Sequence, residues 1–146
     1  MESYFEVPTI ALVTALECVD VAIKEGAKLR VAVVVTVVDR GMSMVAFGRA
    51  DGATPHSVET SRRKANTAAS TGKPTGWMSD AFAIQLPLGT GGLLTNILGG
   101  FPLKFGEKHV GGLGIAGGTP AQDATVGIAT LTAIGAQNFD QESLEA

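Results

Sequence analysis

The feature that most constrains the fold is a ten-residue run, residues 29–38, which reads LRVAVVVTVV. It holds one charged residue, and most of its side chains are β-branched. Such a run is typical of a strand buried on both faces, because β-branched side chains pack well on a pleated sheet. The turn residues Asp39, Arg40 and Gly41 follow, and residues 43–48 continue as a second extended segment. The pattern predicts a hairpin at the centre of a sheet that must be covered on both sides.

Helices are expected before, between and after the strands. Leu12, Leu16, Val19 and Ile23 form one apolar stripe and predict a helix over about residues 8–25, with Pro8 near its start and Gly26 as its stop. Further helices are expected over residues 56–70, within 76–88 and over about 120–135. The last of these begins at a capping box, residues 119–122. Residues 101–105 and 110–116 flank the turn 106–108 and predict a second hairpin.

These elements indicate an α/β sandwich with a mainly antiparallel sheet of about five strands, formed by one domain of residues 1–146. Charged residues make up 17 % of the chain, below the usual share of about 25 %. A small domain with so few charges hides apolar surface most simply by self-association, so we expect a homo-oligomer. The single cysteine, Cys18, excludes an intramolecular disulfide.

The charge pattern narrows the partners. Net charge is −3, and the strongest basic cluster is Arg62–Lys64, on a predicted helix. Nucleic acid is therefore not expected as the main partner, because phosphate binding needs a broad basic face. No apolar run reaches about 18 residues, so no membrane span is expected. Acidic residues interrupt the N-terminal segment, which is unlike a secretory signal, and the expected location is the cytoplasm.

Residues 112–117 match the G-x-G-x-x-G pattern of dinucleotide-binding proteins. That pattern should open a βαβ unit with an acidic residue about 20 positions on. Position 137 is glutamine, and only nine residues remain after it. We therefore expect no nicotinamide cofactor, and glycines that let another backbone or a ligand approach closely. No H-E-x-x-H or C-x-x-C motif is present, so no structural metal site is expected either.

A few polar residues are candidates for chemistry. The Gly117–Gly118 turn before the last helix offers backbone N–H groups to a carboxylate or phosphate, although it can equally be a plain helix cap. Lys64 lies among small residues, where it can extend to solvent or point into a pocket as a base or anion clamp. His56 and His109 are each compatible with an ordinary surface role or with a functional one.

Several short segments together resemble the GlcG/HbpS haem-binding-like family, which includes the C-terminal domain of PduO-type proteins. The resemblance covers Val33 to about Ala133. Its segments are residues 37–41 (VVDRG), 49–53 (RADGA), 64–65 and 67–68 (KA, TA), 99–103 (GGFPL), 110–118 (VGGLGIAGG) and 122–123 (QD).

The resemblance implies an α-β-α sandwich of profilin-like type around a roughly five-stranded sheet, assembled into homo-oligomers. Some members of the family bind haem or corrinoid, and others occur beside small-acid catabolism. The first function it suggests is binding of haem or a related tetrapyrrole, a small anionic partner. In this hypothesis Trp77, Met78 and Phe101 form an apolar slot, while Arg49, Lys64 or the Gly118 turn hold the propionates, and His56 or His109 reaches the iron, with Met or Cys18 as the next choices.

Two other functions stay open. One is a cofactor-independent enzyme, such as an isomerase or lyase, that moves a proton on a small carboxylate metabolite. Its candidate acid–base groups are Lys64, Asp39 and His56, and Gly117 and Gly118 are its candidate oxyanion donors. The other is a structural or regulatory subunit without a ligand, which the low charge and high apolar content fit without further assumptions.

Overall fold

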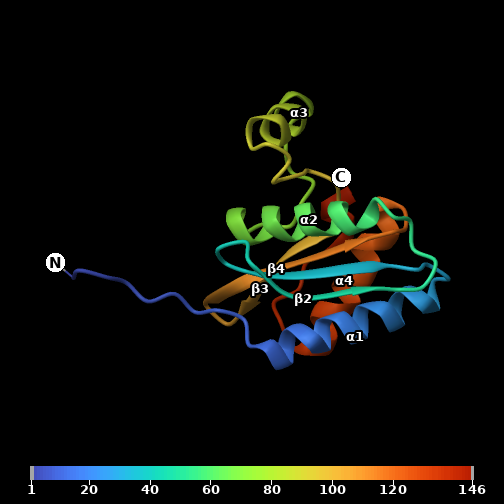
Figure 1. Cartoon of the computed structure of the whole chain (residues 1–146), viewed down its shortest axis with the longest axis horizontal. Coiled ribbons are helices and arrows are strands. Elements are labelled where there is room, and N and C mark those ends of the chain that lie inside the picture. The colour runs from blue at the N-terminus through green and yellow to red at the C-terminus, as the bar shows by residue number, and fades with distance from the viewer. Residues whose placement is uncertain (1, 146) are drawn as a thin grey trace.

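The computed structural model describes residues 2–145; the ends of the expected 1–146 domain, Met1 and Ala146, lie outside the described residues. As far as α4, helices and strands follow one another in the order expected from the sequence, and the short α5 was not predicted (Figure 1). The elements are α1 (Leu12–Lys28), β1 (Val34–Asp39), β2 (Met44–Arg49), α2 (Ser57–Thr71), α3 (Asp80–Gly89), β3 (Gly100–Phe105), β4 (Lys108–Ala116), α4 (Pro120–Ile134) and α5 (Gln141–Glu145).

The strands form one antiparallel sheet in the order β2-β1-β4-β3. Both predicted hairpins are confirmed, but the sheet has four strands, and the expected five is wrong. The glycine-rich segment 89–99 supplies no strand. Its backbone is held on α2 instead: the Asn66 side chain donates to the Leu93 carbonyl at 3.2 Å, and the Thr95 N–H donates to the Thr67 hydroxyl at 2.9 Å.

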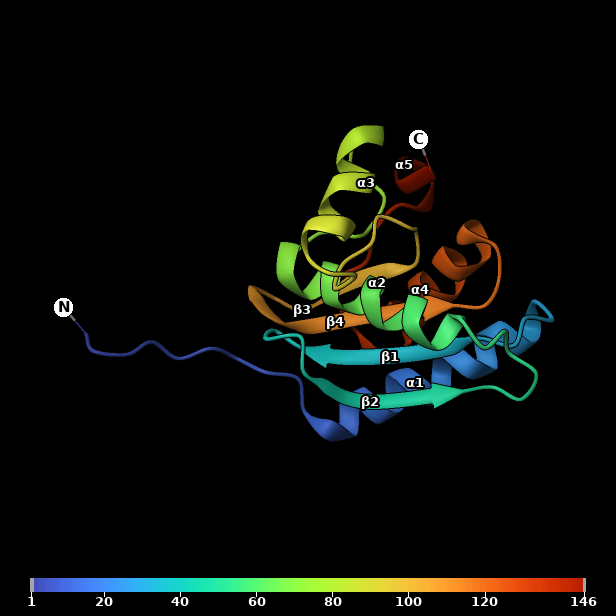
Figure 2. The same ribbon diagram turned by 45° about the horizontal axis from the view of Figure 1, so that its top comes forward.

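Helices cover both faces of the sheet (Figures 1 and 2). The α1 and α4 helices pack against each other and on one face, while α2 lies across β1, β4 and β3 on the other. The predicted mixed α/β sandwich is thus confirmed. Among the described residues, none of the helices is long and apolar enough to cross a bilayer.

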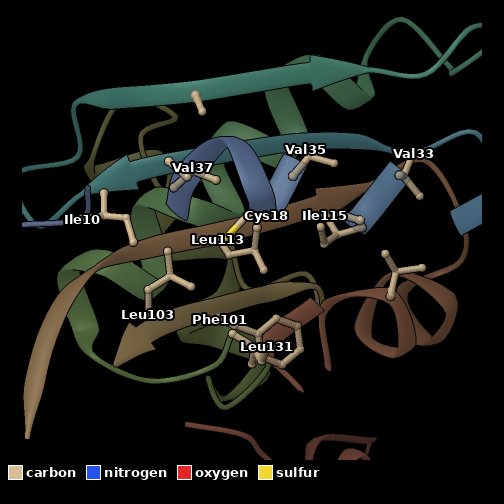
Figure 3. Close-up of a cluster of buried hydrophobic side chains, with 14 of the residues drawn as sticks. Ile10, Cys18, Val33, Val35, Val37, Phe101, Leu103, Leu113, Ile115 and Leu131 are labelled. Atoms are coloured by element: carbon tan, nitrogen blue, oxygen red, sulfur yellow. The ribbon is translucent and has the colours of Figure 1, made fainter. Parts of the chain in front are cut away.

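The main core lies between the sheet and the α1–α4 pair (Figure 3). Val33 and the strand residues Val35, Val37, Leu113 and Ile115 are fully buried there. Cys18 joins this core from α1, and its burial raises the pKa of the thiol to about 12. The side chain is fully buried, so a ligand cannot reach the sulfur without displacing the core.

The opposite face brings α2 very close to β4. A β-carbon on Gly114 would collide with the Ser61 carbonyl, and one on Gly112 would collide with the Ala65 carbonyl. Both glycines belong to the G-x-G-x-x-G match, which here lies in an antiparallel strand rather than in a βαβ unit. Close approach of another backbone, predicted from the sequence, is their observed role.

The helix ends show which boundaries the local sequence pattern predicts correctly and which it does not. The α4 helix has the predicted capping box and ends at Gly135 in a left-handed conformation, as α2 ends at Gly72. The predicted limits of α1 are wrong, because the helix begins at Leu12 and continues past Gly26 to Lys28. Gly26 serves packing: a β-carbon there would lie 2.9 Å from the Val31 carbonyl oxygen.

Two segments extend away from the sheet (Figures 1 and 2). The expected short helix is α3, which has no buried residue although most of its side chains are apolar. Ile84 and Leu88 are 65 % and 76 % exposed. The N-terminal segment carries Tyr4 and Phe5, also exposed, and joins the fold where the Ile10 N–H donates to the Val110 carbonyl at 3.0 Å.

Candidate functional site

A recess of about 360 Å³ opens where α2 and α4 begin, next to the end of β4. We call it the α2–α4 recess. Its size is near the lower end of ordinary ligand pockets, which span roughly 300–1,000 Å³. The residues that line it come from both helix starts, the end of β4 and the loop before β3: Thr54, His56, Ser57, Thr60, Lys64, Ile97, Ala116, Gly117, Gly118, Pro120 and Asp123.

Lys64 and Asp123 form a buried ion pair on the wall of this recess. Lys64 Nζ lies 2.9 Å from Asp123 Oδ2 and also donates to the Ile115 carbonyl at 2.7 Å. The two residues are only 1 % and 2 % exposed. The interpretation of Lys64 as a solvated surface residue is therefore wrong; the pair ties α2 to α4 and to the end of β4.

Burial acts on both members of the pair. It lowers the pKa of Lys64 and raises the pKa of Asp123, because charged forms lose their hydration, while the partner charge opposes each shift. The two shifts bring the proton affinities of the amine and the carboxyl closer together. Titratable groups perturbed by burial and by a partner charge beside a recess are candidates for acid–base chemistry.

The glycine turn differs from the expected anion site. The Gly118 N–H donates to Asp123 Oδ1 at 2.9 Å, and the Thr119 N–H donates to the Gln122 side chain at 2.9 Å. These two donors are therefore bonded within the chain. Gly117, at φ 122°, has no room for a side chain, because a β-carbon would lie 2.5 Å from the Ala32 carbonyl oxygen.

The two histidines lie at opposite ends of α2. His56 is the exposed N-cap residue and forms part of the rim of the α2–α4 recess. His109 lies beside Gly72, the residue that ends the helix, and its Nε2 is 3.0 Å from the Gly111 carbonyl oxygen. Burial, together with Arg40 and Lys104, lowers the pKa of His109. The structure thus places one histidine at the recess and the other in a half-buried contact elsewhere.

Asp39 and Arg49, two other candidates, lie outside the recess. Asp39 ends β1, and its carboxylate accepts hydrogen bonds from the Gly41 and Ser43 N–H groups at 2.8 Å and 3.0 Å. Arg49 ends β2, is exposed, and pairs with Val34 of β1. The α2–α4 recess lies at this end of the strands, but Arg49 does not line the recess. Asp39 thus shapes a turn.

The three residues of the expected apolar slot lie in two separate places. Phe101 is 1 % exposed and packs in the core, next to Leu131 in Figure 3. Trp77 and Met78 instead line a separate recess of about 500 Å³, in which the Lys73 ammonium lies 4.6 Å from the centre of the Trp77 ring. Phe101 therefore cannot form one ligand wall with the other two.

Several residues of the recess were missed from the sequence. Asp123 belongs to one of the family-like segments, but nothing local indicates that it pairs with a lysine 59 positions away. Thr54 and Ile97 lie in loops that the fold brings to the recess, and a pattern of neighbouring residues does not predict this. Within residues 2–145 no cluster of three or more His, Cys, Asp or Glu side chains could hold a metal ion.

Comparison with known proteins identifies the class of protein. The model of the family described as haem degrading protein HbpS-like matches residues 10–132. The chain therefore belongs to the HbpS-like family, which confirms the resemblance inferred from its short segments. No curated protein sequence matches the chain at a significant level.

Solved structures give the particular relatives. Protein ORFY of Klebsiella pneumoniae is 30 % identical, with a TM-score of 0.87 over 94 % of this chain and 99 % of its own. PduOC, in a complex with haem, is 26 % identical, with a TM-score of 0.82 over 90 % of this chain and 99 % of its own. A double mutant of HbpS from Streptomyces reticuli is 27 % identical, with a TM-score of 0.80 over 91 % and 92 % of the two chains.

Proposed function

We propose that this protein binds haem or a related tetrapyrrole at the α2–α4 recess, with His56 as the iron ligand. The observation that carries the proposal is the position of His56, exposed at the rim of a recess formed by two helix starts. A neutral imidazole is a common haem ligand. His109 is a weaker candidate because it is half-buried and lies outside this recess.

The residues around the recess fit the parts of a tetrapyrrole. Ile97, 47 % exposed, and Pro120 offer apolar contact for a macrocycle face. Lys64 makes two hydrogen bonds to described residues, and an ammonium has three donors, so one remains for an acidic group. The recess, at about 360 Å³, is small, so these residues would hold only part of a tetrapyrrole. When bound, haem would supply an iron centre for ligand binding or redox chemistry.

A haem complex of a relative supports the proposal. PduOC shares this fold over 90 % of the chain and was solved with haem. Fold similarity alone does not transfer a ligand residue, so the assignment of His56 depends on the geometry of this chain.

The proposal is tested by titrating haem into the purified protein and following the Soret absorption. We expect the parent and His109→Ala to give the same saturable spectral change. His56→Ala should lose the histidine-ligated spectrum, and its affinity should fall at least tenfold. If only His109→Ala loses the spectrum, the iron ligand is at the other end of α2. If the double variant keeps the parent spectrum, neither histidine is a ligand.

A second candidate, proton transfer on a small carboxylate, is favoured by one observation. The Lys64–Asp123 pair is buried at a recess that is large enough for a small metabolite, and its members have pKa values shifted toward each other. His56, at the rim, supplies a third titratable group. Such an arrangement can remove a proton from carbon and return it without a cofactor.

This second function has its own readout. Small hydroxy and keto acids are incubated with the protein in D2O, and loss of their C–H signals is followed by proton NMR. Protein-dependent exchange that is reduced in His56→Ala would support catalysis at the recess. No exchange above the protein-free rate for any acid would contradict it, whatever the result of the haem titration.

We also infer that the protein forms a homo-oligomer. The α3 helix is apolar around its circumference yet has no buried residue, and such helices are normally covered. Sedimentation equilibrium at micromolar concentration should give a multiple of the 14.9 kDa chain mass. A monomer mass would contradict the inference. Ile84→Glu and Leu88→Glu should shift the distribution toward smaller species.

A further inference from the structure

A second recess adjoins the proposed site. It has a volume of about 270 Å³ and lies between the end of α1 and the start of α4. It shares Thr54, Gly117 and Gly118 with the α2–α4 recess, so the two recesses adjoin each other at these residues. We call it the Arg30 recess, after the one charged residue among those that line it: Leu29, Arg30, Val31, Ala32, Gly52, Ala53, Thr54, Gly117, Gly118 and Gln122.

Arg30 has an unfavourable backbone conformation. Its φ is 60°, in the left-handed region, where the chain turns back after α1. The Val31 N–H donates to the Gly26 carbonyl and the Arg30 N–H to the Ala27 carbonyl, at 2.9 and 3.0 Å, which is the usual way to end a helix. Glycine takes this conformation without a steric cost, and a residue with a β-carbon does not.

The other long helices show which residue type stands at a helix end of this kind. The α2 and α4 helices end at Gly72 and Gly135, both left-handed. Only at the end of α1 does an arginine stand in the corresponding position. The backbone thus favours glycine at residue 30, which indicates that the arginine is kept for its side chain.

The Arg30 guanidinium has no acidic partner within the described part of the chain. The ion pairs found there involve Lys24, Lys28, Arg62, Arg63 and Lys64, each with a carboxylate within 4.0 Å. Arg30 is exposed and lines a recess that contains no carboxylate side chain among its lining residues. Its charge and its donors therefore remain available to a ligand.

We propose that Arg30 binds a carboxylate group of the ligand, in the recess that adjoins the α2–α4 recess. A guanidinium can donate two parallel hydrogen bonds to one carboxylate, which fixes the orientation as well as the charge. The two adjoining recesses then favour a ligand with two separate parts, one that binds at His56 and an acidic group that binds at Arg30. The inference rests on the proposed function, in which the acidic group is a propionate of haem.

The test compares Arg30→Gly with Arg40→Ala, which removes an exposed arginine from the opposite end of β1. Haem and its propionate dimethyl ester are titrated into each protein, and the melting temperature is measured without ligand. We expect Arg30→Gly to melt higher than the parent, to bind haem at least tenfold more weakly, and to discriminate little between haem and ester. Arg40→Ala should retain the parent's affinity and discrimination.

Two results separate this inference from the function on which it rests. If Arg30→Gly binds haem as tightly as the parent, Arg30 is only a helix stop and the inference is overturned. If the parent binds no haem, the proposed function fails, and calorimetric titration with succinate decides about Arg30. Binding by the parent that is at least tenfold weaker in Arg30→Gly supports the carboxylate site; equal binding, or none, overturns it.

Discussion

The two ends of α2 carry similar residues and use them differently. His56 stands at the first end, and Lys64, from the middle of the helix, lines the recess there; His109 and Lys104 lie beside Gly72 at the second end. At the second end, the Lys104 ammonium donates to the Gly72 carbonyl at 2.8 Å, and His109 lies at hydrogen-bond distance from a carbonyl oxygen. These groups complete the end of the helix and the adjacent turn.

At the first end the polar groups are arranged around an open recess. His56 is exposed at its rim, and the buried Lys64–Asp123 pair lies on its wall. The comparison teaches that residue type does not separate a functional end from a structural one. What separates them is the histidine: the His109 ring lies against a carbonyl oxygen of the chain, whereas the exposed His56 ring has no hydrogen-bond partner among the described residues and can bind another molecule.

The largest expected effect is at the buried pair. Lys64→Met leaves Asp123 buried without its partner and should lower the free energy of unfolding by about 3–5 kcal/mol. The double variant Lys64→Met/Asp123→Leu should recover most of this loss, because apolar residues can replace a buried pair at little cost. Urea unfolding measures both. A loss below about 0.5 kcal/mol in Lys64→Met would be typical of an exposed lysine and would contradict the burial.

Two glycine substitutions in β4 can disturb its contact with α2 at two different points along the helix. Gly114→Ala pushes against Ser61 near the first end, and Gly112→Ala pushes against Ala65 and Ala69 farther along the helix. Each should cost about 1–3 kcal/mol, as overpacking usually does. Only Gly114→Ala should also weaken haem binding. Gly89→Ala is the control, since a β-carbon there meets no atom within 4 Å.

A smaller effect is expected at the second end. Lys104→Met removes a cation that donates to the carbonyl of Gly72, the residue that caps the end of α2, and should cost about 0.3–1 kcal/mol, the usual scale for a charge at a helix end. Haem affinity should not change. A tenfold loss of affinity in Lys104→Met, with stability unchanged, would mean that the ligand site extends to this end.

The smallest expected effect is a pH dependence from His109. Its pKa in the folded protein lies below 6.5, so between the two pKa values the unfolded chain binds more protons than the folded one. The free energy of unfolding should therefore fall as the pH drops below about 6.5 and level off below the folded pKa. His109→Gln should reduce this fall, with His56→Gln as the control. If the free energy of unfolding of His109→Gln falls as much as that of the parent, other groups cause the pH dependence.

Much of the fold could be predicted because its signals are local. The β-branched run of residues 29–38, the two turns and the capping box at Thr119 each act within a few residues, and the hairpins and α4 follow from them. The limits of α1 could not be predicted, because Gly26 is required by packing against Val31 and Val33 rather than by the end of the helix. The loop after α3 forms no fifth strand because side chains of α2 hold its backbone.

The site was predictable only in part. His56, Lys64, Gly117 and Gly118 were recognised one by one, and the structure brings them to one recess. The pairing of Lys64 with Asp123 depends on how α2 and α4 meet across the end of β4, which no local pattern encodes. His109 could not be separated from His56, because both stand beside turns in the sequence, and only the fold makes one exposed at a recess and the other half-buried.

The central claim is that the first end of α2 is the binding end. It is tested most directly by a nitrogen–proton NMR titration with a diamagnetic haem analogue, gallium protoporphyrin. We predict that the amides of Thr54, residues 56–60, Gly117 and Gly118 shift or broaden, and that those of Gly72 and residues 104–111 stay in place. Perturbation confined to Gly72 and residues 104–111 would contradict the account and move the site to the other end of the helix.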